Sequence, residues 1–519
     1  MPENVDYLVI GAGPAGLQLA YLLGRAGRNH LVLEAGGVPG AFFVDQPRHR
    51  QMISINKPHT GSADPELNLR VDWNSLLCDD DGFRFTGYTD RYFPDADDYL
   101  RYLADFARRF DLAIRYHTRV VRVARAGDDR GGFLVTDEHG GQYRARRVIA
   151  AIGFGATNVP PIEGIELARQ YADMSIDPDD YTDQRVLIIG KANSAFETAD
   201  ALTERAAVIH VVGPHSLKMA WKTHFIGHLR AVNNNFLDTY QLKTQNSVLD
   251  ATVDKIERDE RGYWVTMSYA RRDETVRFRY DAVLCCTGFR MDASFFAPDC
   301  RPATTINDRF PALTSAWESV SVPDLYFAGT LTQSRDFKEF TSAFIHGFRY
   351  GVRALSRMLD QRYERTPWPG RPVPRDPAAI ADALLARANR TSGLWQQFTF
   401  LADVVCLSAD GARYLEEVPR DYLADGGIED AATVLTLTME YGPGHEDLDP
   451  FDVAAGRAWE AQHGRDDRYL HPVVRLLVDG TEVAVHRIKE NLDNEWTDPV
   501  THRAPLVSYL TDQLAAQSR

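Results

Sequence analysis

The sequence predicts an α/β protein with two Rossmann-like dinucleotide-binding domains, the second inserted into the first, followed by a C-terminal α+β extension. A strand–glycine turn–helix–strand pattern occurs near the start of the chain and again near residue 185, which is the arrangement of a βαβ nucleotide unit. Apolar strands that end in glycine follow the second unit, and a proline-rich stretch precedes a last part without such a motif. The expected divisions are 1–175 and 281–365 for the first domain, 176–280 for the inserted domain and 366–519 for the extension.

The composition is that of an ordinary globular chain and excludes several classes of function. The chain has 519 residues, of which 44% are hydrophobic and 25% are charged, close to the average for soluble domains. Its formal charge of −15 argues against nucleic acid or anionic lipid as a general partner. The apolar run Tyr7–Gly24 follows an acidic start and is broken by glycine and proline. We therefore expect a cytoplasmic protein with neither a signal peptide nor a membrane span.

The five cysteines, at positions 78, 285, 286, 300 and 406, are few and lack a C-x-x-C spacing. This excludes a disulfide framework and a zinc ribbon, and no metal site is expected. A disulfide reductase needs a spaced cysteine pair, whereas Cys285 and Cys286 are adjacent. Their apolar surroundings are typical of a buried strand, which favours two small core side chains over a redox pair.

The first βαβ unit begins with the strand Asp6–Ile10 and ends with the strand His30–Glu34. The turn after the first strand reads Gly11-Ala-Gly13-Pro14-Ala15-Gly16, a G-x-G-x-x-G motif, and a helix is expected over Leu17–Arg28. Because the motif follows a strand, opens a helix and precedes an acid at the end of the next strand, it strongly indicates dinucleotide binding.

Each of the key residues in this unit has a physical role. Gly11 permits the tight turn, Gly13 lets the backbone approach a pyrophosphate, and Gly16 lets the helix pack close to the strand. The N–H groups at the start of the helix, with its positive dipole end, face the phosphates. Glu34 can accept hydrogen bonds from a ribose diol.

The second βαβ unit consists of the strand Gln184–Gly190, the helix Phe196–Arg205 and the strand Ala207–Val212. In its turn, Ala192 and Ala195 replace two of the three glycines. This motif alone is therefore a weaker indication of nucleotide binding than the first one.

The loop after this second unit bears on which pyridine nucleotide would bind. It carries His215 and Lys218 but no acid. A basic side chain accepts a 2′-phosphate that an acid would repel. The loop therefore favours NADPH over NADH, and a solvated loop remains the alternative interpretation of both side chains.

Further elements complete the first domain and build the extension. The strand Thr118–Val123 is a place where adenine can meet backbone groups, at Val120 among them. The other elements expected from the sequence are helices over Asp95–Phe110, Ser342–Leu359, Pro377–Asn389 and Pro505–Gln517, and strands over Arg147–Gly153, Tyr280–Gly288, Val322–Thr330, Val434–Glu440 and Val473–Val478. The extension shows no nucleotide motif and no catalytic cluster.

Two dinucleotide folds in one chain indicate FAD in the first domain and NADPH in the inserted one, with hydride passing between them. Without a redox cysteine pair, O2 is the expected oxidant, and its chemistry needs an enclosed flavin face. We expect a monooxygenase that hydroxylates nitrogen or carbon of a small-molecule substrate through a flavin C4a-(hydro)peroxide. A flavin oxidase or reductase that passes electrons to a partner, or an FAD-binding protein without monooxygenase activity, is the alternative. A homodimer stays open.

Several segments outside the nucleotide motifs carry a family resemblance. They are Pro47–Arg50, Ile53–Lys57, Asp72–Leu76, Asn193–Thr198, Val232–Lys243, Phe344–Tyr350, Leu401–Val404 and Asp498–Pro499. Together with the order of the nucleotide units, they resemble the class B flavin monooxygenases and, among their relatives, the endoplasmic reticulum flavoprotein associated with degradation. The resemblance runs through most of the chain and implies a soluble, bacterial-type member of that group.

The resemblance also implies roles for individual residues. Asn56 falls where flavin-containing monooxygenases carry an asparagine beside the isoalloxazine, where it would orient oxygen; a turn asparagine before Lys57 is the alternative. From the motifs and the resemblance together, the residues expected to bind FAD are Gly11, Gly13, Pro14, Ala15, Gly16, Glu34, Val120, Gly329, Thr330 and Leu331, and those expected to bind NADPH are Gly190, Asn193, Ser194, His215 and Lys218.

One motif of that class is incomplete in this chain. In class B enzymes F-x-G-x-x-x-H precedes the second fold, and the corresponding run Ile162–Ala168 keeps only the glycine. His346 is the expected proton-transfer residue, because an unperturbed imidazole titrates near neutrality. Trp73 and Trp221 are expected to wall a substrate pocket, with core packing as the alternative.

Overall fold

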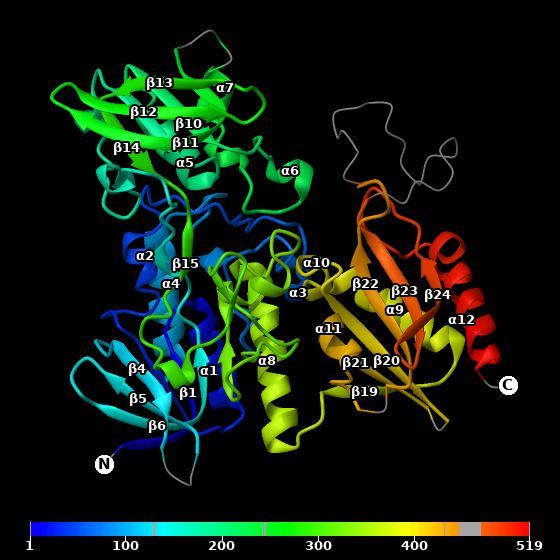
Figure 1. Cartoon of the computed structure of the whole chain (residues 1–519). Helices are drawn as coiled ribbons and strands as arrows, with labels where there is room; N and C mark the ends of the chain where they lie inside the picture. The colour runs from blue at the N-terminus through cyan, green and yellow to red at the C-terminus, as the bar shows by residue number, and fades with distance from the viewer. Residues whose placement is uncertain are drawn as a thin grey trace.

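The computed structural model describes residues 2–127, 131–240, 242, 245–409, 411–429, 431–445 and 469–517. Within these residues three large sheets define three units. Two α/β units lie one above the other, and the C-terminal unit lies beside the lower one (Figure 1). The expected class, two Rossmann-like folds and a C-terminal α+β part, is confirmed.

The first sheet is a parallel core with an antiparallel pair at one edge. Tyr7–Ile10 at the end of β1 are buried in succession, as expected for a parallel strand covered on both faces. Along the sheet the strands are β3 (Ile114–Arg115), β2 (His30–Leu33), β1 (Glu3–Ile10), β6 (Gln142–Ala150), β5 (Phe133–Asp137) and β4 (Val120–Arg125), with β18 (Leu325–Phe327) also paired to β6.

The second sheet repeats this plan. Its strands, in order, are β13 (Thr275–Tyr280), β12 (Gly262–Tyr269), β11 (Ser247–Asp259), β10 (Val208–Gly213), β9 (Arg185–Ile189), β14 (Ala282–Cys285) and β8 (Arg169–Gln170). The strands β8 and β14 fall outside the range 176–280 expected for the inserted domain. Since Leu284 pairs in parallel with both Ile188 and Arg169, we propose that this unit extends from about Arg169 to Cys285.

After the inserted unit the chain returns to the first sheet. β18 pairs in parallel with β6, with Leu325 opposite Val148, and leads through Gly329 to the long helix α8 (Ile345–Glu364). α8 packs against α1 (Pro14–Arg25). This return places the start of α8 at the same edge of the sheet as the first glycine turn.

α1 begins and ends three residues earlier than the sequence indicated, at Pro14 and Arg25. Proline suits the first position of a helix, because its fixed φ is helical and its missing N–H is not needed there. Gly27, with φ of 69°, follows the last turn and supplies the left-handed backbone that commonly ends a helix.

The C-terminal unit is an antiparallel sheet flanked by helices. α9 (Pro377–Arg390) packs on this sheet and on α12 (Ala504–Ala516), while α8 packs on its strand β21. In order, its strands are β19 (Gly370–Val373), β21 (Gly411–Pro419), β20 (Leu401–Ser408), β22 (Thr433–Glu440), β23 (His471–Val478) and β24 (Thr481–Arg487). Of these, only β22 and β23 were expected, because the apolar run of β20 gives no alternation to read.

Further helices and two small strand pairs lie within and between these units. The remaining helices are α2 (Phe42–Asp45), α3 (Pro65–Asn68), α4 (Ala96–Arg109), α5 (Asn193–Leu202), α6 (Ala220–Thr223), α7 (Asn235–Tyr240), α10 (Gly393–Gln396) and α11 (Arg420–Ala424). Two small pairs join β7 (Gly155–Thr157) to β15 (Phe289–Met291) and β16 (Thr304–Thr305) to β17 (Phe310–Pro311). None of the helices in the described residues combines the length and apolar character that a membrane crossing requires.

Candidate functional site

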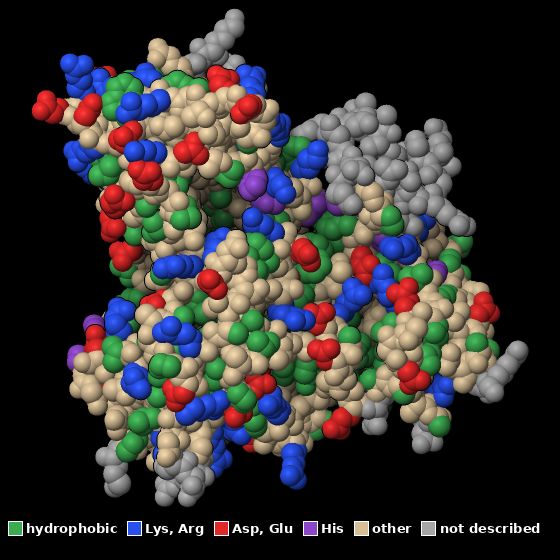
Figure 2. Space-filling view, viewed as in Figure 1, with side chains coloured by type: hydrophobic (Ala, Val, Ile, Leu, Met, Phe, Trp, Pro, Cys, Tyr) green, Lys and Arg blue, Asp and Glu red, His purple; other side chains and the backbone are tan. Residues whose placement is uncertain are grey.

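A cavity of about 870 Å³ lies where the two α/β units meet. Figure 2 shows a hollow below the upper unit, with hydrophobic side chains in its depth. The wall includes the first glycine turn and the end of β2 on one side, Asn193 and Ser194 at the start of α5 on another, and Phe344–His346 at the start of α8. One space thus reaches both nucleotide folds.

The first glycine turn is built for close backbone approach. Gly11 has φ of 99°, and a Cβ there would lie 2.7 Å from the carbonyl oxygen of Ala151. A Cβ on Gly16 would lie 2.0 Å from the Gly11 carbonyl oxygen, whereas one on Gly13 would meet no protein atom within 4 Å. Gly13 also caps α1 without a side-chain hydrogen bond. The first helical N–H groups therefore remain available to an anion at the cavity.

Glu34 lines the cavity and also holds the turn. Its carboxylate accepts hydrogen bonds from the backbone N–H groups of Ala12, at 2.6 Å, and Gly36, at 2.7 Å. Each oxygen keeps a further acceptor site. Glu34 can therefore serve the ribose as expected while it fixes the loop that carries Gly13.

Val120 and Thr330 both line the cavity. Gly329 has φ of 78°, and a Cβ there would lie 2.7 Å from the Ala15 Cβ, so this glycine lets the chain pass over the start of α1. Leu331 is wholly buried in the core and does not line the cavity. Its side chain is therefore a packing residue, contrary to expectation.

The second glycine turn repeats the close approach of the first. Gly190 has φ of 126°, and a Cβ there would lie 2.2 Å from the Cys286 carbonyl oxygen. The Asn193 side chain donates to the His228 carbonyl at 2.8 Å and accepts from the Arg230 N–H at 3.0 Å. The Asn193 side chain thus binds the loop 228–230 to α5. The backbone N–H groups at the start of α5 and the Ser194 side chain remain to contact a ligand in the cavity.

His215 and Lys218 are both exposed and neither lines the cavity. The end of β10 does have an acid beside it, because Asp250 on the neighbouring strand β11 lies opposite Gly213. Asp250 forms ion pairs with Lys191 and, at 3.6 Å, with Arg271. The expectation from the loop alone missed this acid because it is supplied by another strand.

Asn56 does not line the cavity, contrary to expectation. Its side chain is fully buried, and its amide donates to the carbonyl groups of Thr89, at 2.7 Å, and Arg91, at 3.2 Å. Asn56 therefore holds the loop 89–92. Trp221, 43% exposed and outside the cavity wall, also departs from its expected place.

His346 lines the cavity and lies in a stack of side chains. Its ring stacks on the ring of Trp73, with 4.2 Å between the two centroids. The guanidinium of Arg230, which belongs to the inserted unit, lies 5.2 Å from the centre of the Trp73 ring. Neither ring nitrogen of His346 has a protein partner. Burial, reinforced by the charges of Arg349 and Arg230, lowers the pKa of His346 well below its usual value. The imidazole is thus neutral near pH 7, unlike the titrating group that the sequence suggested.

Glu197, which the sequence did not single out, lies one turn into α5 and lines the cavity. Its carboxyl accepts a hydrogen bond from the Tyr171 hydroxyl at 3.0 Å. Burial raises the pKa of Glu197 to about 7, while the Tyr171 hydrogen bond opposes that rise. The sequence could have indicated Glu197, because it is an acid in the first turns of a nucleotide-binding helix. Its partner Tyr171 could not be indicated in this way, because it comes from a distant segment.

Residues 8–329 match the family described as pyridine nucleotide-disulphide oxidoreductase. The FAD-dependent oxidoreductase domain-containing protein 2 of Mus musculus is 35% identical, over 99% of this chain and 84% of the mouse protein. The chain belongs to the pyridine nucleotide-disulphide oxidoreductase family. It is a flavin-dependent oxidoreductase, and the family match ends before the C-terminal unit begins.

Two solved structures share the fold of this family member. The flavin-containing monooxygenase from Stenotrophomonas maltophilia has a TM-score of 0.53 at 22% identity, over 69% of this chain and 98% of its own. A bacillithiol disulfide reductase from Staphylococcus aureus has a TM-score of 0.51 at 20% identity, over 69% and 99%. These two likenesses concern the fold alone.

The cysteines of this oxidoreductase lie away from its cavity. All five are among the described residues, and none lines the wall. Cys285 and Cys286 are 0% and 2% exposed, and burial raises the pKa of both thiols. Buried thiols with raised pKa are poor nucleophiles, so this pair behaves as two small core side chains.

We expect replacement of both Cys285 and Cys286 by alanine to leave the rate of flavin reduction by NADPH within about twofold of the wild type, since these thiols act as core side chains. The rate is measured by anaerobic stopped-flow absorbance of the bound flavin, and steady-state turnover is measured beside it. A loss of turnover of about tenfold or more, with flavin still bound, would instead favour thiol chemistry.

Proposed function

We propose that this flavin-dependent oxidoreductase is an NADPH-using monooxygenase that hydroxylates a small molecule with O2. The observation that best supports the proposal is that one continuous cavity reaches both nucleotide folds and has no cysteine among its described wall residues. A hydride donor and a flavin would share one space there. Without a thiol within reach, O2 is the acceptor that this space favours.

The residues of the cavity wall suit FAD. Gly13 would present backbone without a side chain to the pyrophosphate, Glu34 would present carboxylate oxygens to a ribose, and Val120 would border the adenine. Thr330 and His346 would border the isoalloxazine. Bound FAD supplies the two-electron chemistry, and the protein supplies binding, orientation and control of protons.

The stack at the flavin end controls hydrogen bonding in the cavity. Because His346 is neutral, one ring nitrogen donates and the other accepts. Its contact with Trp73 fixes the plane of the ring, so both nitrogens keep a constant direction. His346 can thus hold a proton at a defined atom of the cavity, and we propose that it relays protons between ligands, accepting a proton at one ring nitrogen as it gives up the proton of the other.

Glu197 gives this proposal a pH dependence. Below about pH 7 its carboxyl is neutral, and above that value it becomes an anion in the wall where an anionic dinucleotide would lie. We expect the Kd for NADPH to rise roughly five- to tenfold between about pH 6 and pH 8, because two negative charges then face one another. Glu197→Gln should flatten this rise, as measured by fluorescence titration.

Asp200 provides the matched control for Glu197. Burial raises its pKa to about 6, yet it lies outside the cavity wall. Asp200→Asn should therefore keep the rise in Kd but move it to lower pH, because the Asp200 charge contributes to the raised pKa of Glu197. A dependence that disappears in Asp200→Asn and persists in Glu197→Gln would contradict the assignment.

The monooxygenase proposal is tested with isotopically labelled O2. The holoprotein is given NADPH and a panel of small amines and activated aromatic compounds, and the products are analysed by mass spectrometry. We expect one labelled oxygen atom in a product and less H2O2 than NADPH consumed. H2O2 in equal amount to NADPH with every compound would overturn the proposal.

A flavin reductase or oxidase that passes electrons to a partner is the second candidate, favoured by one observation. Ala168, where class B enzymes carry the histidine of their motif, is buried and packs in the core of the inserted unit. Gly164 of that motif has φ of 79°, and a Cβ there would lie 2.0 Å from the Ile256 carbonyl oxygen, so local packing alone explains this glycine. Rapid NADPH-dependent reduction of an artificial electron acceptor, without product oxygenation, would support this candidate.

A further inference from the structure

The segment 64–76 forms the part of the cavity wall that carries Trp73. It includes α3 and runs from Asp64, which caps that helix, to Leu76. Trp73 lines the cavity and stacks on His346. The direction of the Trp73 ring therefore depends on what holds this segment in place.

The C-terminal unit holds the middle of the segment through backbone carbonyl groups. The buried Arg70 guanidinium donates to the carbonyl groups of Ala388, at 2.8 Å, and Thr391, at 2.9 Å, at the end of α9. In return the Gln396 side chain donates to the Arg70 carbonyl at 2.6 Å. The exchange joins α9 and α10 to the residues just before Trp73.

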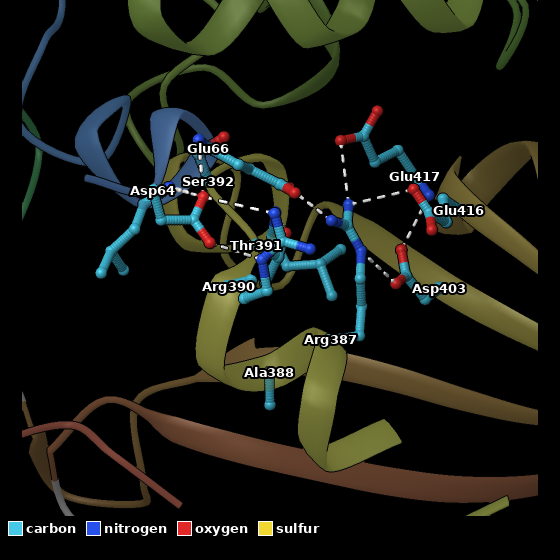
Figure 3. Close-up of polar contacts among 12 residues, drawn as sticks. Asp64, Glu66, Arg387, Ala388, Arg390, Thr391, Ser392, Asp403, Glu416 and Glu417 are labelled. Carbon is cyan, nitrogen blue, oxygen red and sulfur yellow. Dashed lines mark hydrogen bonds and ion pairs between the residues drawn. The ribbon is translucent and has the colours of Figure 1, made fainter. Parts of the chain in front are cut away.

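Arg387 on α9 makes the second connection, and Figure 3 shows its guanidinium between carboxylates of different units. It forms an ion pair with Glu66 of α3, and with Asp403 at 2.9 Å and Glu417 at 3.2 Å on the sheet of the C-terminal unit. The guanidinium and the two sheet carboxylates are almost wholly buried. Buried charges must keep all their partners to be tolerated, so this cluster fixes α3 against the C-terminal sheet.

The first unit holds the segment from the other side. Arg349, which is fully buried on α8, donates to the carbonyl groups of Leu69, at 2.8 Å, Asp72, at 2.9 Å, and Ser75, at 2.8 Å. Arg349 lies one turn beyond His346 on the same helix. The helix α8 thus carries His346 and, through Arg349, also binds the segment that the C-terminal unit contacts from the other side.

We infer that the C-terminal unit is a positioning element of the cavity, which sets Trp73 against His346 through Arg387, Arg70 and Gln396. This assigns a role to a part of the chain that lacks any nucleotide motif. The inference rests on the proposed function in one respect, because it takes the cavity to be a flavin site. The contacts between the C-terminal unit and the segment 64–76 are the same whether or not a flavin binds there.

Hydrogen–deuterium exchange on the full chain tests this inference. Glu66→Gln removes the carboxylate that Arg387 pairs with, and Gln396→Met removes the donor to Arg70 at similar volume. We expect amides in 69–76 to exchange about fivefold faster or more in each variant, since each loses a charge-assisted or buried hydrogen bond. We also expect a weaker near-ultraviolet circular dichroism signal from Trp73, defined as the part lost in Trp73→Phe.

Asp382→Asn is the matched control. Asp382 lies on the same helix α9 and pairs with Arg503 at 2.7 Å, on the side of the C-terminal helix. This variant should change neither readout. Unchanged exchange or an unchanged Trp73 signal in both test variants, or an equal change in the control, would overturn the inference. Because both readouts work without FAD, they stand whether or not the monooxygenase proposal holds.

Discussion

Replacing Gly13 by alanine should lower the affinity for FAD by about tenfold to a hundredfold and leave the fold intact. An alanine Cβ at this position meets no protein atom within 4 Å, and Gly13 faces the cavity. The methyl group would instead occupy the space in which a pyrophosphate must approach the backbone N–H groups. Each factor of ten corresponds to about 1.4 kcal/mol of lost binding. Titration of the apoprotein with FAD measures the change.

Gly87→Ala is the control for this prediction. Gly87 also has no protein atom within 4 Å of an added Cβ, and it lies outside the cavity wall. The thermal unfolding midpoints of the two apoprotein variants should be alike, and only Gly13→Ala should lose FAD. Equal FAD affinity in Gly13→Ala and the wild type would mean that FAD does not lie along the first glycine turn.

Replacing His346 by phenylalanine should lower kcat by about a hundredfold or more, the usual range for loss of a proton-transfer group. Phenylalanine keeps the stack on Trp73 but removes both nitrogen atoms, which have no protein partner to leave unpaired. Steady-state turnover, with FAD content measured separately, gives the effect. Because the pKa of His346 lies well below its usual value, the wild-type profile of kcat should show no inflection near pH 6.5 from this residue.

His486→Phe is the matched control for His346. His486 stacks on Tyr509 at 5.2 Å in the C-terminal unit, and burial lowers its pKa as well. It does not line the cavity. Its replacement should leave kcat unchanged. A loss in His346→Phe that is matched by an equal loss of FAD would show packing rather than proton transfer.

The sequence was sufficient where the signal is local. Gly11, Gly13, Gly16 and Glu34 form one βαβ unit, and the backbone conformation that each glycine permits is a property of the turn itself. The parallel strands β1, β2, β6, β9, β10 and β14 were expected for the same reason, since each is a short apolar run beside a turn, whereas the charged strands β11, β12 and β13 were not. The expected return of the chain to the first domain takes the form of β18, which pairs in parallel with β6.

The sequence was insufficient where a side chain's role depends on a distant segment. Asn56 points to the carbonyl groups of Thr89 and Arg91 rather than to the cavity. Similarity to a family indicates which residue matches a family position, but it does not indicate where the side chain of that residue points. Glu197 gained its raised pKa from burial beside Tyr171, and Asp250 reached the end of β10 from another strand. The strands β20 and β21 follow one another in the chain and pair in antiparallel register, and they were missed for another reason, because neither run alternates between apolar and polar residues.

Anaerobic mixing of the FAD-loaded protein with NADPH tests whether one cavity brings a flavin and a pyridine nucleotide together. We expect the visible absorption of the flavin to bleach, and the Gly13→Ala protein to give a smaller signal in proportion to the FAD that it fails to bind. If the flavin of the wild type stays oxidised with both NADPH and NADH, yet is reduced by dithionite, the two nucleotides do not meet in this cavity and the account is wrong.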